Sequence, residues 1–148
     1  MRILALLALV PALAFGQQSP ASVVEALYRD FPVDARDTIM QQPRAVLDRY
    51  FAPELAAAIE ADGQCVEQTR EVCNLDFVPQ WDSNDPGAEK LQIAPAADDI
   101  VVVRFNYPGR SIPVALSYVL VQTESGWRIS DIRGANWTLS GLLAVKSK

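Results

Sequence analysis

The chain has 148 residues, 50% of them hydrophobic and 21% charged, which is typical of a single globular domain with its own core. Its 13 Lys and Arg against 18 Asp and Glu give a formal charge of −5, and it contains no histidine. This acidic balance argues against a nucleic acid partner, because such proteins present a basic surface. It favours basic partners, or it serves solubility alone.

The first 16 residues are expected to be a signal peptide. Arg2 is a minimal charged start, and Ile3–Val10 is an apolar run too short to anchor the chain stably in a membrane. Small residues allow cleavage after Ala14 or after Gly16. A buried N-terminal helix is the alternative. Residues 17–148 are therefore predicted to be one domain of a periplasmic or secreted protein.

The two cysteines, Cys65 and Cys73, are predicted to form a disulfide, as an even count in an oxidising compartment suggests. On one straight helix their Cα atoms would be about 12 Å apart, which is too far to bridge. The helix must therefore break or turn between them. A metal site would need further soft or imidazole ligands, and no histidine exists to supply them.

The first half of the chain predicts helices. Ser22 with Glu25 is a capping-box pattern, and apolar residues then recur at helical spacing to Asp30. Pro43 opens a second helix and Pro53 a third, which Asp62-Gly63 is expected to end. One or two further helical turns are expected over 64–72, around the cysteine pair.

The second half predicts strands. A short strand is expected at Lys90–Ala94 and a clear one at Ile100–Tyr107. Residues from Ile112 onward alternate, with a polar connection ending in Gly126 and a return arm to Arg133, so they predict an antiparallel hairpin. Helices followed by an antiparallel meander predict an α+β fold, with helices packed on one face of a curved sheet.

Three segments resemble a family of small exported bacterial proteins of unknown function: Arg49–Leu55, Phe77–Asp82 and Gly126–Ile132. The resemblance covers about 22–136 and implies a cystatin-like or nuclear-transport-factor-two-like cone. Some members of that family are immunity proteins, which protect the producer's periplasm from antibacterial effectors delivered by contact-dependent secretion systems. The resemblance therefore implies a cognate secreted effector protein as partner.

No catalytic signature is present, so we do not expect an enzyme, a cofactor or a metal ligand set. The chain lacks a Gly-x-Ser-x-Gly elbow, a phosphate loop and a Cys–His pair. Enzymes with the cone usually carry an acid–base pair with histidine, which this chain cannot supply. Asp131 is the best single candidate for proton transfer because apolar strand residues surround it. The competing interpretation is that Asp131 faces solvent or pairs with Arg104, Arg128 or Arg133.

Binding is the leading hypothesis, through a set of aromatic and charged residues near predicted loops: Trp81, Asp82, Asp85, Tyr107 and Arg110. The acidic residues of the helical half are either a solvated face or a surface that meets a basic toxin. The alternative hypothesis is a small-molecule carrier that uses the apolar interior of the cone.

Overall fold

The computed structural model describes residues 18–144, so the predicted signal peptide lies outside the described residues. The elements run in the order α1 (Pro20–Asp30), η1 (Ile39–Gln41), α2 (Arg44–Leu47), α3 (Pro53–Thr69), β1 (Glu89–Ala97), β2 (Ile100–Asn106), β3 (Val114–Thr123), β4 (Gly126–Arg133) and α4 (Leu139–Ala144). The strands form one antiparallel sheet in the order β1-β2-β3-β4. The predicted α+β class, with helices preceding an antiparallel meander, is confirmed.

The sheet buries one face, and a bulge in β4 keeps that face continuous. Val119 pairs with Asp131, whereas the next residue, Leu120, pairs with Ile129. Ser130 is therefore an extra residue in β4, as in a β-bulge. Because of this extra residue, Ile129 and Ile132 both point into the core, and neither is exposed. The buried face comprises Val101, Val103, Phe105, Leu116, Tyr118, Leu120, Ile129 and Ile132.

Ile112 departs from the predicted hairpin. The first arm begins at Val114, and Ile112 lies in a bend with 81% of its surface exposed. Pro113 separates the two and has no N–H to donate to a strand ladder, which explains why pairing starts after it. The prediction that the first arm of the hairpin starts at Ile112 was therefore wrong.

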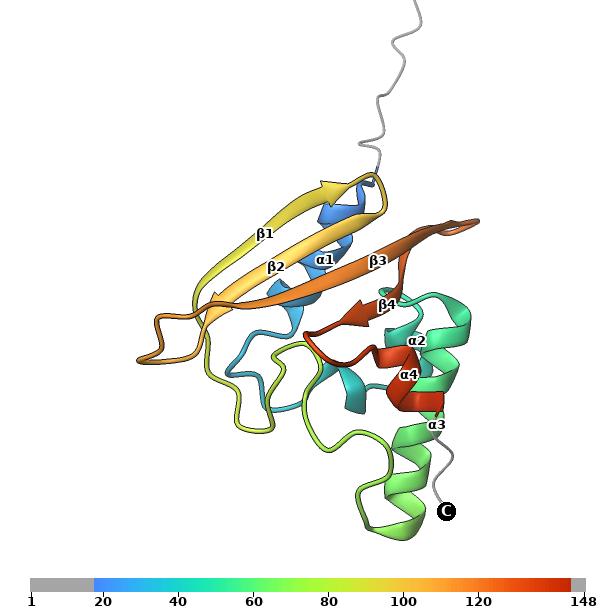
Figure 1. The fold of residues 1–148 in the computed structure, drawn as a ribbon. Helices are drawn as coiled ribbons and strands as arrows, with labels where there is room; N and C mark the ends of the chain where they lie inside the picture. The colour runs from blue at the N-terminus through green and yellow to red at the C-terminus, as the bar shows by residue number, and fades with distance from the viewer. Residues whose placement is uncertain (1–17, 145–148) are drawn as a thin grey trace, which may run out of the picture.

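Helix α1 covers the buried face of the sheet, behind the strands in Figure 1. It begins at Pro20 rather than at the predicted cap Ser22. The N-cap is Ser19, and Ser19 and Ser22 exchange backbone-to-side-chain hydrogen bonds of 3.1 Å. A serine at the third helical position thus completes the capping box that was expected to need Glu25.

Aromatic side chains fill the space between α1 and the sheet. The Trp81 ring packs edge-on against Tyr28 and Phe105, with ring centroids 4.9 and 5.4 Å away. The Tyr28 hydroxyl lies 2.7 Å from the carbonyl oxygen of Gln80 and 2.9 Å from the Tyr118 hydroxyl. All of these residues are 5% exposed or less. The interior that a carrier of this architecture was expected to use for its ligand is therefore occupied by side chains.

Helix α3 is one continuous helix of 17 residues, so the prediction that Asp62-Gly63 ends it was wrong. Gly63 lies within the helix although glycine has a low helix propensity, and α3 is held by contacts with η1, α2, α4 and β4. The helix ends instead at Arg70, whose left-handed backbone (φ 60°) turns the chain back. This turn brings the Cα atoms of Cys65 and Cys73 to 6.2 Å, and the predicted disulfide and the predicted turn are both confirmed.

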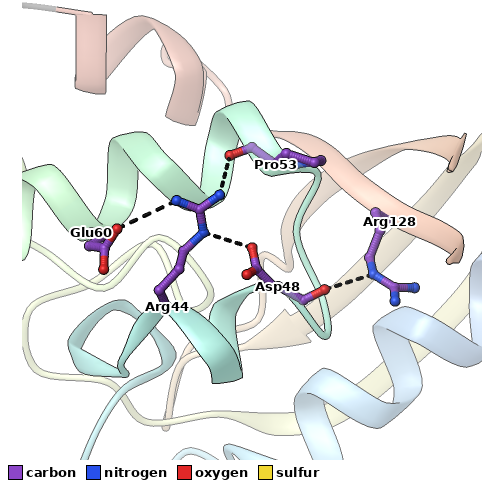
Figure 2. A network of polar contacts seen from close by, with 5 residues as sticks. All are labelled: Arg44, Asp48, Pro53, Glu60 and Arg128. Carbon is purple, nitrogen blue, oxygen red and sulfur yellow. Dashed lines mark hydrogen bonds and ion pairs between the residues drawn. The ribbon is translucent and has the colours of Figure 1, made fainter. Parts of the chain in front are cut away.

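A polar network fixes α3 to the β4 edge of the sheet (Figure 2). The Arg44 guanidinium donates to the Asp48 carboxylate at 2.7 Å, to Glu60 at 3.4 Å and to the Pro53 carbonyl at 3.2 Å. Arg128 of β4 donates to the Asp48 carbonyl at 2.8 Å. Together these contacts hold the first half of α3 against α2 and the sheet, and they fix the orientation of the helix.

Candidate functional site

A groove of about 770 Å³ lies along one face of α3. Its other walls are the 38–43 segment and the 72–84 loop, which runs beside α3 in Figure 1. Apolar side chains form much of its lining: Met40, Ile59, Val66, Val72, Leu75, Phe77 and Val78. Ile59 is fully buried beneath it, whereas Val66 and Val72 are 39% and 67% exposed. The groove therefore offers an apolar surface that water reaches.

The charged residues that line the groove are all acidic: Glu60, Asp62, Glu67 and Asp76. Glu60 is paired with Arg44. Asp62 is almost fully buried, at 6% exposure, and its carboxylate accepts a 2.7 Å hydrogen bond from the backbone N–H of Asn74. The groove thus joins an apolar surface to a set of carboxylates.

Two contacts hold the 72–84 loop as a wall of the groove. The Cys65–Cys73 disulfide fastens its start to the last turns of α3, and the Asp62–Asn74 hydrogen bond lies just beside it. Further along, the Val78 N–H donates to the Ser83 carbonyl at 2.9 Å. The start of the 72–84 loop is therefore held near the C-terminal end of α3 by one disulfide and one hydrogen bond.

The predicted partner-binding residues are divided between the core and a second site. Trp81 is buried, and the Asp82 carboxylate accepts a 2.8 Å hydrogen bond from the Trp137 indole N–H. The other three, Asp85, Tyr107 and Arg110, line a second hollow of about 450 Å³ beyond the end of β2. The Tyr107 hydroxyl donates to the Asp82 carbonyl at 2.7 Å, and burial, with the negative charge of Asp82, raises the pKa of Tyr107.

Asp131, the candidate for acid–base chemistry, is engaged at the start of α4. Its carboxylate accepts hydrogen bonds of 3.0 Å from the Ser140 N–H, the Ser140 hydroxyl and the Ile132 N–H. Arg133 lies 4.0 Å away. These contacts give Asp131 a helix-capping role, and it lines neither hollow.

The sequence interpretation missed the groove. Asp62 and Gly63 line the groove, but this pair predicts a helix end, so the sequence does not show the two halves of α3 as one face. A signal was present: Ile59 and Val66 are seven residues apart, as apolar residues on one helical face are. The opposite wall comes from an irregular loop, whose position no periodicity encodes.

Two further findings concern membranes and metals. No helix within residues 18–144 has the length and apolar character needed to cross a bilayer. In the same part of the chain, no three His, Cys, Asp or Glu side chains gather closely enough to hold a metal ion.

Comparison with known proteins leaves the family open. No protein-family model matches the chain, and no curated protein matches it. Among solved structures it is similar to the phospholipid-binding protein from Ralstonia solanacearum, determined in complex with a phospholipid. That similarity has a TM-score of 0.36 and 20% sequence identity, over 84% of this chain and 68% of the other. A similarity at this level carries no argument about function, which is therefore argued from the groove.

Proposed function

We propose that this chain is a periplasmic binding protein that holds a small amphiphilic molecule in the α3 groove. The groove itself carries the proposal. Its volume of about 770 Å³ falls within the roughly 300 to 1,000 Å³ of small-molecule sites. Its lining also has the composition of such sites, an apolar surface with a few polar groups at fixed positions.

Export is part of the proposal. The apolar run at 3–10 supports a cleaved signal peptide, and the Cys65–Cys73 disulfide is a bond that persists in oxidising compartments. A binding rather than catalytic role is supported by the absence of histidine from the sequence and by the engagement of Asp131 in capping α4.

The proposal is tested by asking whether the groove is where amphiphiles bind. Mature protein is purified from a periplasm without detergent, and retained molecules are extracted and identified by mass spectrometry. Calorimetric titration with short-chain amphiphiles then measures affinity. Gly63→Leu is the blocking variant, because a Cβ at Gly63 meets no atom closer than the Met40 carbonyl oxygen at 4.0 Å, and larger side chains extend into the groove.

Gly63→Ala is the matched control, since it adds only the Cβ and improves helix propensity by up to about 1 kcal/mol. We expect binding to wild type and Gly63→Ala and at least tenfold weaker binding to Gly63→Leu, about 1.4 kcal/mol. Equal binding to all three, or no binding to any, rejects the groove as the site.

A second candidate function is that of an immunity protein, which binds and neutralises a cognate toxin delivered by a contact-dependent secretion system. The observation that favours it is the second hollow, where Asp85, Tyr107 and Arg110 gather as an aromatic and charged surface. Here the test is binding to the product of the neighbouring gene. Arg110→Glu is expected to weaken that complex while Gly63→Leu leaves it unchanged, and the reverse pattern rejects this surface.

A further inference from the structure

Asp62 is a buried acidic residue that lines the groove. It is 6% exposed, and one of its oxygens accepts the Asn74 N–H at 2.7 Å. Among residues 18–144, no Lys or Arg lies within ion-pair distance of it. Its neighbour on α3, Glu60, shows the usual arrangement, because Arg44 lies 3.4 Å from its carboxylate (Figure 2).

An unpaired buried charge is costly, since the carboxylate loses water and gains only part of the compensation that a cation gives. The single backbone hydrogen bond to Asp62 supplies some of that compensation. A positive group placed in the groove would supply the rest. Because Asp62 lines the groove, the position that such a group would occupy is open to a ligand.

The rest of the lining is suited to a cation and unsuited to an anion. Glu67 and Asp76 add negative charge, and no lysine or arginine occurs among the described residues that line the groove. An anionic head group would meet carboxylates and no cation to pair with. A calcium ion takes six to eight oxygen ligands, which one buried carboxylate does not provide, whereas an ammonium group needs only a strong acceptor and water.

We propose that the ligand of the α3 groove carries an ammonium or guanidinium group that pairs with Asp62, while its apolar part lies on Val66, Val72 and Leu75. This inference rests on the proposed binding function and names the ligand class. It predicts a cationic amphiphile, and it places the charged end at the wall where the 72–84 loop meets α3.

The test compares three probes with the same eight-carbon chain: octylammonium, octanol and octanoate. Calorimetric titrations are made on wild type, Asp62→Asn and Glu124→Gln. Asparagine keeps an oxygen that accepts the Asn74 N–H, so Asp62→Asn removes the charge and retains the contact. Glu124 is exposed in the β3–β4 turn, so Glu124→Gln removes the same charge far from the groove.

We expect wild type and Glu124→Gln to bind octylammonium about tenfold more tightly than octanol, with octanoate weakest. Asp62→Asn should bind octanol as wild type does and lose the preference for octylammonium. If all three probes bind wild type equally, or if Asp62→Asn keeps the preference, the cation site is rejected while the groove function stands. If no probe binds wild type, both are rejected.

Discussion

The buried Tyr28 and Tyr118 hydroxyls form a directed chain. A carbonyl oxygen can only accept, so Tyr28 donates its proton to Gln80, and Tyr118 must then donate to Tyr28. Burial raises the pKa of both phenols, so both remain protonated at neutral pH. The two hydroxyls are therefore not equivalent, although both side chains are buried.

This asymmetry predicts that Tyr28→Phe and Tyr118→Phe lower the free energy of unfolding by different amounts. Tyr28→Phe leaves the Gln80 carbonyl and the Tyr118 hydroxyl without their partner, so we expect a loss of about 2 to 3 kcal/mol in the free energy of unfolding. Tyr118→Phe removes only a donor to Tyr28 and should cost about 1 kcal/mol. Urea denaturation measures both. Equal costs would contradict the assigned direction of the chain.

Tyr50 and Asp30 form a second pair, which makes stability depend on pH. The Tyr50 hydroxyl donates to the Asp30 carboxylate at 2.6 Å. This hydrogen bond, with Arg29 and Arg49 nearby, holds the pKa of Asp30 below its usual value. Burial, followed by the bond to Asp30 and its charge, raises the pKa of Tyr50 to about 12.

The signs of the two shifts define a window for the contribution of the pair. Because the pKa of Asp30 is lowered on folding, its carboxylate stabilises the fold at pH values above its unfolded pKa of about 3.9. This stabilisation is lost as the pH falls through the folded pKa. Because the pKa of Tyr50 is raised on folding, its phenol stabilises the fold at pH values below its unfolded pKa of about 10. This stabilisation is lost as the pH rises towards the folded pKa. We expect Tyr50→Phe to cost about 1 kcal/mol near pH 7, and less below pH 4 or above pH 10. Denaturation across this range checks it, and a pH-independent difference would count against the pair.

At the scale of elements, the disulfide is the main link between the tip of α3 and the 72–84 loop. It closes a short loop, and the loop-closure model gives about 2.5 kcal/mol for a ring of this size. We expect reduction to lower the free energy of unfolding by about that amount and to weaken amphiphile binding, because the loop is one wall of the groove. Urea denaturation and titration with and without reductant measure both effects.

A Cys65→Ser, Cys73→Ser double variant is the control for that experiment. It should resemble the reduced protein and show no further response to reductant. Retention of full groove affinity in the double variant would mean that the Asp62–Asn74 bond and the packing of the loop hold the wall without the disulfide.

Regular elements could be predicted from the sequence because their periodicity is local. The strand at 100–107 and the return arm were expected within a residue or two. The bulge at Ser130 was not, because which residue is extra depends on the register with Val119 and Leu120. The extent of α3 was also missed, since Asp62-Gly63 is a local stop signal, whereas the contacts of α3 with α4, η1, α2 and β4 are tertiary.

For the whole molecule, the order of helices and strands was enough to predict the α+β class, but not the position of the hollows. Of the two aromatic residues that were expected to bind a partner, Trp81 is buried in the core, whereas Tyr107 lines the second hollow. The groove arises where a helix, a 3-10 turn and an irregular loop meet, all within residues 38–84. Such a site depends on tertiary placement, so no single stretch of the chain could reveal it.

The net charge of −5 gives the molecule a field that attracts any cation, and this must be separated from a specific contact at Asp62. Salt separates the two. Raising NaCl from about 10 mM to about 1 M shortens the Debye length from about 30 Å to about 3 Å, which screens exposed charges such as Glu67 but affects a buried carboxylate far less.

We therefore expect octylammonium to bind wild type more weakly in about 1 M salt, while the ratio of its affinities for wild type and Asp62→Asn falls by no more than about twofold. Titration of both proteins at the two salt concentrations measures that ratio, with Glu124→Gln as the charge-matched control. If the ratio of the two affinities falls to one in high salt, octylammonium is attracted by the overall charge of the protein and does not pair specifically with Asp62.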